Sequence, residues 1–150
     1  MKYTSEKFGF TAQVPDGWRP SEAEHAVTFK PEGEDTGPNI TVTPAPDQAP
    51  NDLSLHKGGL AFFKKVVQDQ IDSTVEFGNE QCFENNGHEA IAFNLAYSYN
   101  FDDKLLHVAK MQVFYKKDGQ ILSITGTTTA EDFEDRYPVF RAFTESVQLL

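Results

Sequence analysis

The sequence lacks the features that would place it in several large classes of protein. The 150-residue chain contains one cysteine, Cys82, so no disulfide can form within it and nothing requires an oxidising compartment. No stretch approaches the roughly 18 apolar residues of a membrane-spanning helix, and the first residues contain no apolar signal-peptide core. We therefore expect a cytoplasmic protein that is not a membrane protein.

Positive charge is also scarce. The chain has 13 Lys and Arg residues against 23 Asp and Glu residues, and its formal net charge is −10. A protein that binds nucleic acid or an anionic membrane neutralises phosphates with a patch of basic side chains, and no such patch is visible in the sequence. The composition argues against nucleic acid as a partner and is compatible with a basic or amphipathic protein partner.

Motifs for metal binding and catalysis are missing as well. No pair of histidines has metal-ligand spacing, and neither a nucleophile elbow nor a phosphate-binding glycine loop is present. The histidines are scattered along the chain, at His25, His56, His88 and His107. We predict no catalytic residue, no metal site and no cofactor. Cys82 lies beside Phe83 without a basic neighbour, which predicts a buried and unreactive thiol.

What the sequence does contain is a strong hairpin signal near its end. Asp118-Gly119 separates two runs that alternate apolar and polar residues, which is typical of a two-residue turn. A shift of one residue would bring polar side chains onto the apolar face, so the register is well specified. The predicted pairs are Tyr115 with Leu122, Val113 with Ile124 and Met111 with Gly126 on one face, and Phe114 with Ser123, Gln112 with Thr125 and Lys110 with Thr127 on the other.

The remaining patterns predict an α+β fold in a single domain of residues 1–150. Further strands are expected over residues 8–14, 25–30, 39–43, 75–84, 88–100 and 105–116. One helix is predicted from Ser54 to Ile71, with Ser54 or Asp52 as its cap, and another from about Thr128 or Thr129. Pro138 should kink or break the second helix. The result is an antiparallel sheet of about six or seven strands flanked by helices.

The strand at 88–100 can be covered on both faces, because one face carries large side chains and the other mostly alanine. The large residues are Ile91, Phe93, Leu95, Tyr97 and Tyr99. The loop at 101–104 decides which of these faces joins Met111 and Val113. An even number of loop residues places Phe93 on the face of Gln112, and an odd number places it on the face of Met111 and Val113. The sequence leaves the choice open.

Two stretches resemble the PsbP-like superfamily. They are Phe10-Thr11-Ala12-Gln13-Val14-Pro15-Asp16-Gly17-Trp18 at the start and Gln120–Thr127, followed by Tyr137, Phe140 and Ser146-Val147, at the end. The superfamily includes PsbP, the Mog-type proteins and the bacterial DcrB-related proteins, and the sequence is most similar to the DcrB-related branch. No lipobox cysteine stands near the start, which argues against a lipoprotein of the DcrB type.

The resemblance implies an α/β/α sandwich and non-catalytic protein binding. Within the DcrB-related branch, the Eag chaperones hold transmembrane segments of type VI secretion effectors on a sheet face and act as dimers. The resemblance therefore implies a chaperone-like domain, an apolar or amphipathic helix as its partner, and a homodimer as one oligomeric state.

We accordingly expect the working surface to be a sheet face that the helices leave open. The hairpin register supplies part of a strip, and an even loop at 101–104 adds the rest. The strip comprises Phe93, Leu95, Tyr97, Gln112, Phe114, Ser123 and Thr125. In the alternative, the last helix covers this face as ordinary core. Two other functions remain open: an accessory subunit of a larger assembly, or a small enzyme or metal-binding protein with a pocket between helix and sheet.

Overall fold

The computed structural model describes residues 1–34, 37–45 and 54–150, which form two antiparallel sheets and two α-helices. The large sheet has seven strands in the order β3 (Trp18–Glu22), β4 (Val27–Pro31), β5 (Asn39–Pro44), β9 (Gln120–Thr129), β8 (Lys104–Lys117), β7 (His88–Phe101) and β6 (Glu76–Asn85). The small sheet has the order β1 (Lys2–Ser5), β2 (Phe10–Gln13) and β10 (Gln148–Leu149). The predicted α+β class and antiparallel sheet are confirmed. The sequence patterns did not predict β1, β3 or β10.

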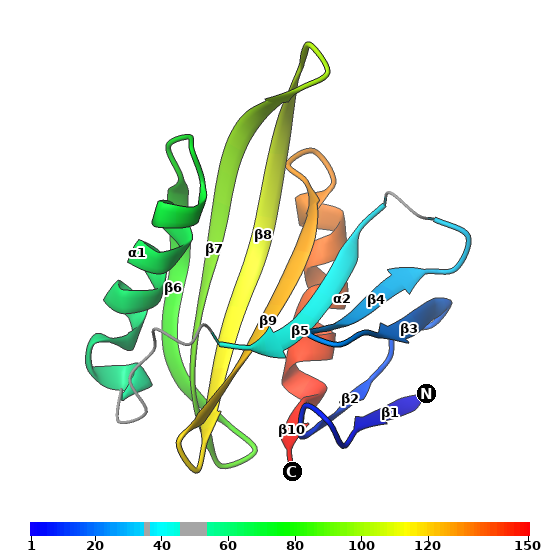
Figure 1. Ribbon diagram of the computed structural model, residues 1–150, viewed down its shortest axis with the longest axis vertical. Coiled ribbons are helices and arrows are strands. Elements are labelled where there is room, and N and C mark those ends of the chain that lie inside the picture. The colour runs from blue at the N-terminus through cyan, green and yellow to red at the C-terminus, as the bar shows by residue number, and fades with distance from the viewer. Residues whose placement is uncertain (35–36, 46–53) are drawn as a thin grey trace.

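The two helices, α1 (Leu60–Gln70) and α2 (Phe133–Ser146), lie on opposite faces of the large sheet (Figure 1). The buried residues accordingly form two clusters. One gathers around Phe63 of α1, and the other joins Phe140 and Phe143 of α2 to the inner side of the small sheet. The sheet is therefore the middle layer of the molecule.

The helix predicted from Ser54 is interrupted before α1 begins. A single π-turn, η1 (Leu55–Gly59), precedes α1, and Gly58 has a φ of +87°, which glycine adopts readily. Ser54 does not cap the helix: its hydroxyl donates to Glu89 on β7, and Glu89 also accepts the N–H of His56 at 2.6 Å. Partial burial acts to raise the pKa of Glu89, but these two hydrogen bonds outweigh it and lower the pKa. The other predicted cap, Asp52, lies outside the described residues.

Four consecutive strands, β6 to β9, form a meander joined by two-residue turns. All six turn residues have positive φ, as the tight turns of hairpins require, and they are Asn86-Gly87, Asp102-Asp103 and Asp118-Gly119. The predicted register of the last hairpin is confirmed throughout. The turn at Asp102-Asp103 has two residues, so the loop that the sequence left open is even, and Phe93 pairs with Gln112.

The second helix begins later than predicted. Thr128 and Thr129 belong to β9, and the Thr129 hydroxyl accepts the N–H of Asp132 at 3.2 Å in the turn that leads into α2. Pro138 lies within α2 without breaking it. At the sixth residue of the helix it removes only the hydrogen bond to the carbonyl of Glu134, which is exposed.

α2 packs closely against β9 at one point. A Cβ atom at Gly126 would lie 2.5 Å from the ring of Phe140, a distance at which one of the two must move. Glycine therefore allows the helix to approach the strand, and Phe140 is 1% exposed.

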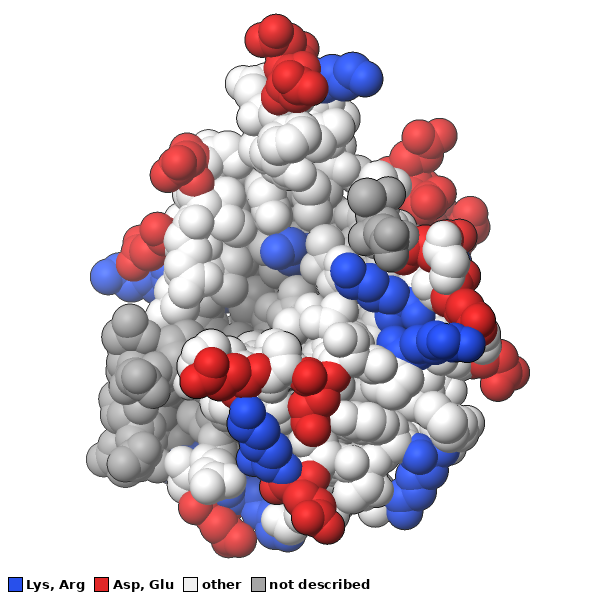
Figure 2. Space-filling view, turned by 45° about the vertical axis from the view of Figure 1, so that its right-hand side comes forward, with Lys and Arg blue, Asp and Glu red and all other residues white. Residues whose placement is uncertain are grey.

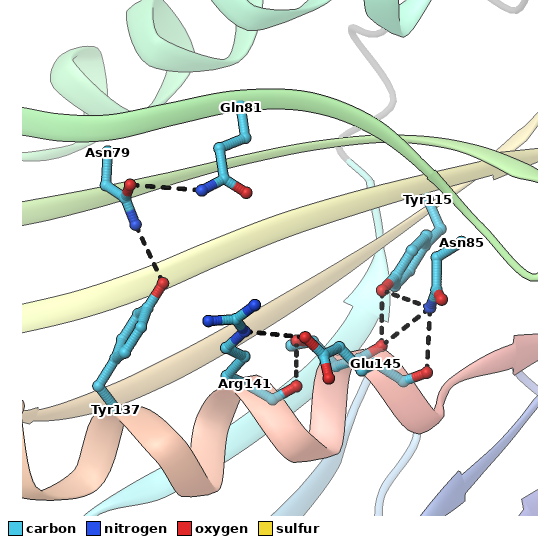
Figure 3. A network of polar contacts seen from close by, with 8 residues as sticks. Asn79, Gln81, Asn85, Tyr115, Tyr137, Arg141 and Glu145 are labelled. Atoms are coloured by element: carbon cyan, nitrogen blue, oxygen red, sulfur yellow. Dashed lines mark hydrogen bonds and ion pairs between the residues drawn. The ribbon is translucent and has the colours of Figure 1, made fainter.

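The C-terminal end of α2 is held by side chains of the large sheet (Figure 3). The Tyr115 hydroxyl donates to the carbonyl of Thr144 at 2.5 Å, and the Asn85 amide donates to the Tyr115 oxygen at 3.0 Å and to the carbonyl of Glu145 at 3.1 Å. These bonds add partners to carbonyls of the last turn, where the Thr144 carbonyl otherwise accepts only the N–H of Val147, at 3.3 Å. Burial raises the pKa of Tyr115 to about 12.

Cys82 is exposed on β6, so the predicted burial of its thiol is wrong. β6 is the outermost strand of the large sheet, and most of its side chains are exposed. The apolar neighbour Phe83 points to the opposite face and is partly buried.

Candidate functional site: the sheet face that α1 covers

The seven residues of the predicted strip lie on one face of the large sheet. Phe93 of β7 is opposite Gln112 of β8, which is opposite Thr125 of β9. One row along, Phe114 is opposite Ser123. The remaining two, Leu95 and Tyr97, follow Phe93 at alternate positions of β7 and so share its face.

The lower part of this strip is covered by α1. The ring of Phe63 stacks on that of Phe114, with centroids 3.9 Å apart and planes 17° apart. Phe93 is fully buried and Phe114 is 3% exposed. The alternative in which the last helix covers this face is wrong, because α2 packs on the other face. The first helix covers it instead, and only in part.

The polar residues of the strip bind one another. Gln112 donates to the Ser123 hydroxyl at 2.8 Å and to the carbonyl of Ile124 at 3.2 Å, and its oxygen accepts the Thr125 hydroxyl at 2.7 Å. Gln112 and Ser123 are buried. A buried amide must be hydrogen-bonded, and here both ends of Gln112 are, so this group ties β8 to β9.

Near the end of α1, residues of the strip line a cleft. The cleft has a volume of about 440 Å³ and runs between the helix and the sheet. Its helical side includes Val67, Gln70 and Ile71, and its floor includes Leu95, Tyr97 and Lys110. The ammonium group of Lys110 lies 5.6 Å from the centre of the Tyr97 ring, in a cation–π arrangement. The floor also includes Gln112, Ser123 and Thr125, so the cleft has a mixed aromatic and polar floor with one cation.

Beyond the cleft, β7 and β8 project from the molecule as a two-stranded arm, residues 97–107 (Figure 1). β6 pairs with β7 only as far as Ala96, and β9 pairs with β8 only as far as Val108. Tyr99 and Phe101 continue the strip onto the arm and are 42% and 66% exposed. Figure 2 shows charged side chains at the tip of the arm and uncharged side chains below it.

The reach of the arm was the part of the site that sequence reasoning missed. A signal was present: the expected strands at 88–100 and 105–116 are longer than the strand at 75–84, so their ends had to extend beyond it. β7 and β8 have 14 residues each, whereas β6 and β9 have 10 each. Strand length alone therefore predicts a projecting hairpin.

Two of the four histidines are hydrogen-bonded through their rings to other groups of the protein. His107 is bonded through Nδ1 to the Ser98 hydroxyl at 2.6 Å, and Nε2 of His56 lies 2.9 Å from the carbonyl oxygen of Phe83. Within residues 1–34, 37–45 and 54–150, no three side chains of His, Cys, Asp or Glu are grouped so that they could hold a metal ion.

Among residues 1–34, 37–45 and 54–150, no helix could cross a membrane. Neither α1 nor α2 has the length and apolar character that crossing a bilayer requires.

The fold is similar to that of several solved structures, although the sequence matches no known family profile and no curated protein. CyanoP, the PsbP of the cyanobacterium Synechocystis sp. PCC 6803, has a TM-score of 0.66 at 20% identity, over 100% of this chain and 92% of that one. PA94 from Pseudomonas aeruginosa, a protein of unknown function, has a TM-score of 0.63 at 14% identity, over 97% and 94%. LpqN of Mycobacterium tuberculosis, involved in cell envelope biogenesis, has a TM-score of 0.56 at 15% identity, over 99% and 89%. The chain thus has a PsbP-like fold.

Proposed function

We propose that this chain is a non-catalytic protein-binding domain, and that it receives a helix of its partner on the sheet face beyond α1. The observation that carries the proposal is the continuity of this face from the cleft onto the arm. We call its outer part the upper strip. It consists of Tyr97, Tyr99, Phe101, Leu106, Val108 and Lys110. Aromatic side chains exposed in a row are typical of a protein interface.

The lengths of the elements favour a helix as the occupant. α1 has 11 residues and is about 16 Å long, whereas β7 has 14 residues and is about 46 Å long. α1 therefore covers about a third of the strand's length. A second helix in line with α1 would cover the upper strip, and its end would meet the cleft.

The charge of the protein favours a cationic amphipathic helix. The net charge is −10, and Asp102 and Asp103 stand at the tip of the arm. Complementary charge on a partner speeds encounter and sets orientation, while its apolar face supplies contact with the upper strip. Of the seven residues predicted from the sequence, Tyr97 and Thr125 are the ones we expect the partner to touch, because the other five are buried. The others would support the site from beneath.

A chaperone of the Eag type is the more specific form of this proposal, with an effector's apolar helix as the client. An accessory subunit of a larger assembly would use the same strip as a permanent interface. The predicted cytoplasmic location and the homodimer remain predictions. A small enzyme or a metal-binding protein with a pocket between helix and sheet remains the alternative.

The test uses a synthetic amphipathic helical peptide with leucine on one face and lysine on the other, and a scrambled peptide of the same composition. Binding is measured by fluorescence anisotropy. The double variant Tyr99→Ser, Phe101→Ser should weaken binding at least about tenfold, since two aromatic contacts are lost. Leu105→Ser is the matched control, because Leu105 is 56% exposed on the opposite face of the same arm.

All the variants should unfold at the temperature of the parent protein, because these side chains are exposed. The proposal is overturned if the double variant binds the peptide as tightly as the control variant does. It is also overturned if the scrambled peptide binds as well as the amphipathic one.

A further inference from the structure

A second cleft lies on the opposite face of the large sheet, between β6 and α2 (Figure 3). Its volume is about 330 Å³, near the lower end of the roughly 300–1,000 Å³ typical of small-molecule sites. The lining is unusually rich in amide side chains. Its polar members include Asn79, Gln81, Asn85, Asn94, Tyr137 and Arg141.

Small residues of the sheet create this space. On this face β7 carries Ala92 beside Asn94, and β6 places Gly78 opposite Asn94. A Cβ atom at Gly78 would meet nothing within 4 Å, so the space in front of it is open. α2 makes its close approach over β9, at Gly126. The outer strands are thus left with room between them and the helix.

A β-bulge directs one amide across the cleft. The register of β6 against β7 shifts between Gly78 and Gln81, and Asn79 has a φ of +51°. Bulges of this kind re-aim side chains and recur beside functional sites. The Asn79 amide donates to the Tyr137 hydroxyl at 3.0 Å, which closes one end of the cleft between strand and helix.

Other polar groups of the lining are free to bind a ligand. In the part of the chain that the structure describes, the Asn94 amide has no hydrogen-bond partner. Its neighbours along β7 on this face are Ala92 and Ala96, whose side chains cannot form hydrogen bonds. Arg141 uses Nε to bind Glu145 at 2.8 Å, and Figure 3 shows its two terminal nitrogens directed into the space between helix and strands. These groups offer donors and an acceptor to anything that enters.

The charges of the lining disfavour an anion. Glu145 is paired with Arg141 at 2.8 Å, and the carboxylate of Glu84 repels negative charge. An amide and a hydroxyl each combine a donor with an acceptor, so amide side chains suit a ligand that carries several hydroxyl groups. An extended peptide is less suited, because the bulge in β6 interrupts the ladder to which it would add.

We propose that the cleft between β6 and α2 binds a neutral, hydroxyl-rich small molecule of the size of one or two sugar rings. Asn94, Gln81 and Arg141 hold its hydroxyl groups, and the Tyr137 ring packs on its apolar face. This site lies on the sheet face opposite the upper strip and does not depend on it.

The test is a titration of the full-length protein with glucose, galactose, mannose, N-acetylglucosamine and maltose, followed by NMR of the side-chain amides. At least one sugar should shift the Asn79, Gln81 and Asn94 signals to saturation at millimolar concentrations, a weak affinity that fits a shallow polar site. Asn94→Ala should weaken this binding at least about tenfold. Asn100→Ala is the matched control, because Asn100 is exposed on the same face of the same strand, out on the arm.

Arg141→Ala should weaken binding similarly, whereas Arg136→Ala on the same helix should not. The proposal is overturned if no sugar gives saturating shifts, or if the variants Asn94→Ala and Asn100→Ala bind equally well. A sugar should leave binding of the amphipathic peptide unchanged, so failure of this proposal and failure of the proposed protein-binding function can be told apart.

Discussion

Removing the Tyr115 hydroxyl should reveal how the sheet anchors the end of α2. In Tyr115→Phe the carbonyl of Thr144 loses its 2.5 Å hydrogen bond and keeps the N–H of Val147, at 3.3 Å, and a 3.5 Å contact with the Asn85 amide. The Asn85 amide loses the Tyr115 oxygen and keeps the carbonyl of Glu145. Both groups keep partners, so we expect the free energy of unfolding to fall by about 0.5–1.5 kcal/mol near neutral pH, the net contribution of one hydrogen bond.

The difference in unfolding free energy between the parent and Tyr115→Phe should depend on pH, in a direction that the pKa of Tyr115 determines. Its folded-state pKa is raised from 10.0 to about 12, because burial disfavours the phenolate. The protonated form therefore contributes stability that is fully present below pH 10 and is lost as the pH rises towards about 12. The slope is about 1.4 kcal/mol for each pH unit in that window.

The assay is urea unfolding of the parent and of Tyr115→Phe at a series of pH values. Every other titrating group is common to the two proteins, so the difference between their unfolding free energies isolates Tyr115. The difference should be constant from about pH 7 to about pH 9, then shrink, and change sign between about pH 10 and about pH 11. A difference that stays constant up to about pH 12 would refute the reasoning, because Tyr115 would then titrate as it does in the unfolded chain.

Three further predictions concern other parts of the fold. Gly126→Ala should lower the free energy of unfolding by about 1–3 kcal/mol, measured in urea, because its methyl group would overlap the Phe140 ring; an unchanged midpoint would mean that α2 does not approach β9 this closely. Cys82 should react with a thiol reagent at nearly the same rate in native and in denatured protein, because it is exposed, and strong native protection would contradict its position. Glu89→Gln should remove a part of the stability that depends on acid, because the lowered pKa of Glu89 contributes stability that is lost as the pH falls through that pKa. The melting temperatures of parent and variant should therefore converge at low pH, and a difference that does not change with pH would show that the bond to His56 contributes nothing.

Local signals in the sequence predicted the local geometry well. The register of the last hairpin followed from Asp118-Gly119 and the alternation around it, because a slip of one residue would have turned Val113 and Ile124 away from the core. The parity of the loop at 101–104 could not be predicted. Asp102 and Asp103 adopt positive φ without a glycine, so the sequence carries no clear mark of the turn.

Features that depend on distant parts of the chain were harder to predict. Apolar residues at helical spacing around Phe63 predict a helix, but not the sheet face on which it packs, since either face of β7 could receive it. Burial of Cys82 was predicted from its neighbours, whereas its exposure follows from the position of β6 at the edge of the sheet. The amides of the second cleft gave no signal, because Asn79, Gln81 and Asn94 converge with Tyr137 only through the bulge and the packing of α2.

The small sheet has a consequence for the order in which the protein can form during its synthesis. Its central strand, β2, lies between β1 from the start of the chain and β10 from its end, and the N–H of Leu150 donates to the carbonyl of Gly9 at 2.9 Å. Phe10 and Ala12 of β2 belong to the same buried cluster as Phe143 of α2. Until α2 and β10 have left the ribosome, β2 therefore keeps one edge unpaired and these side chains uncovered. Closure over so long a loop comes late, so until then the chain relies on the meander of β6 to β9 to hold it together.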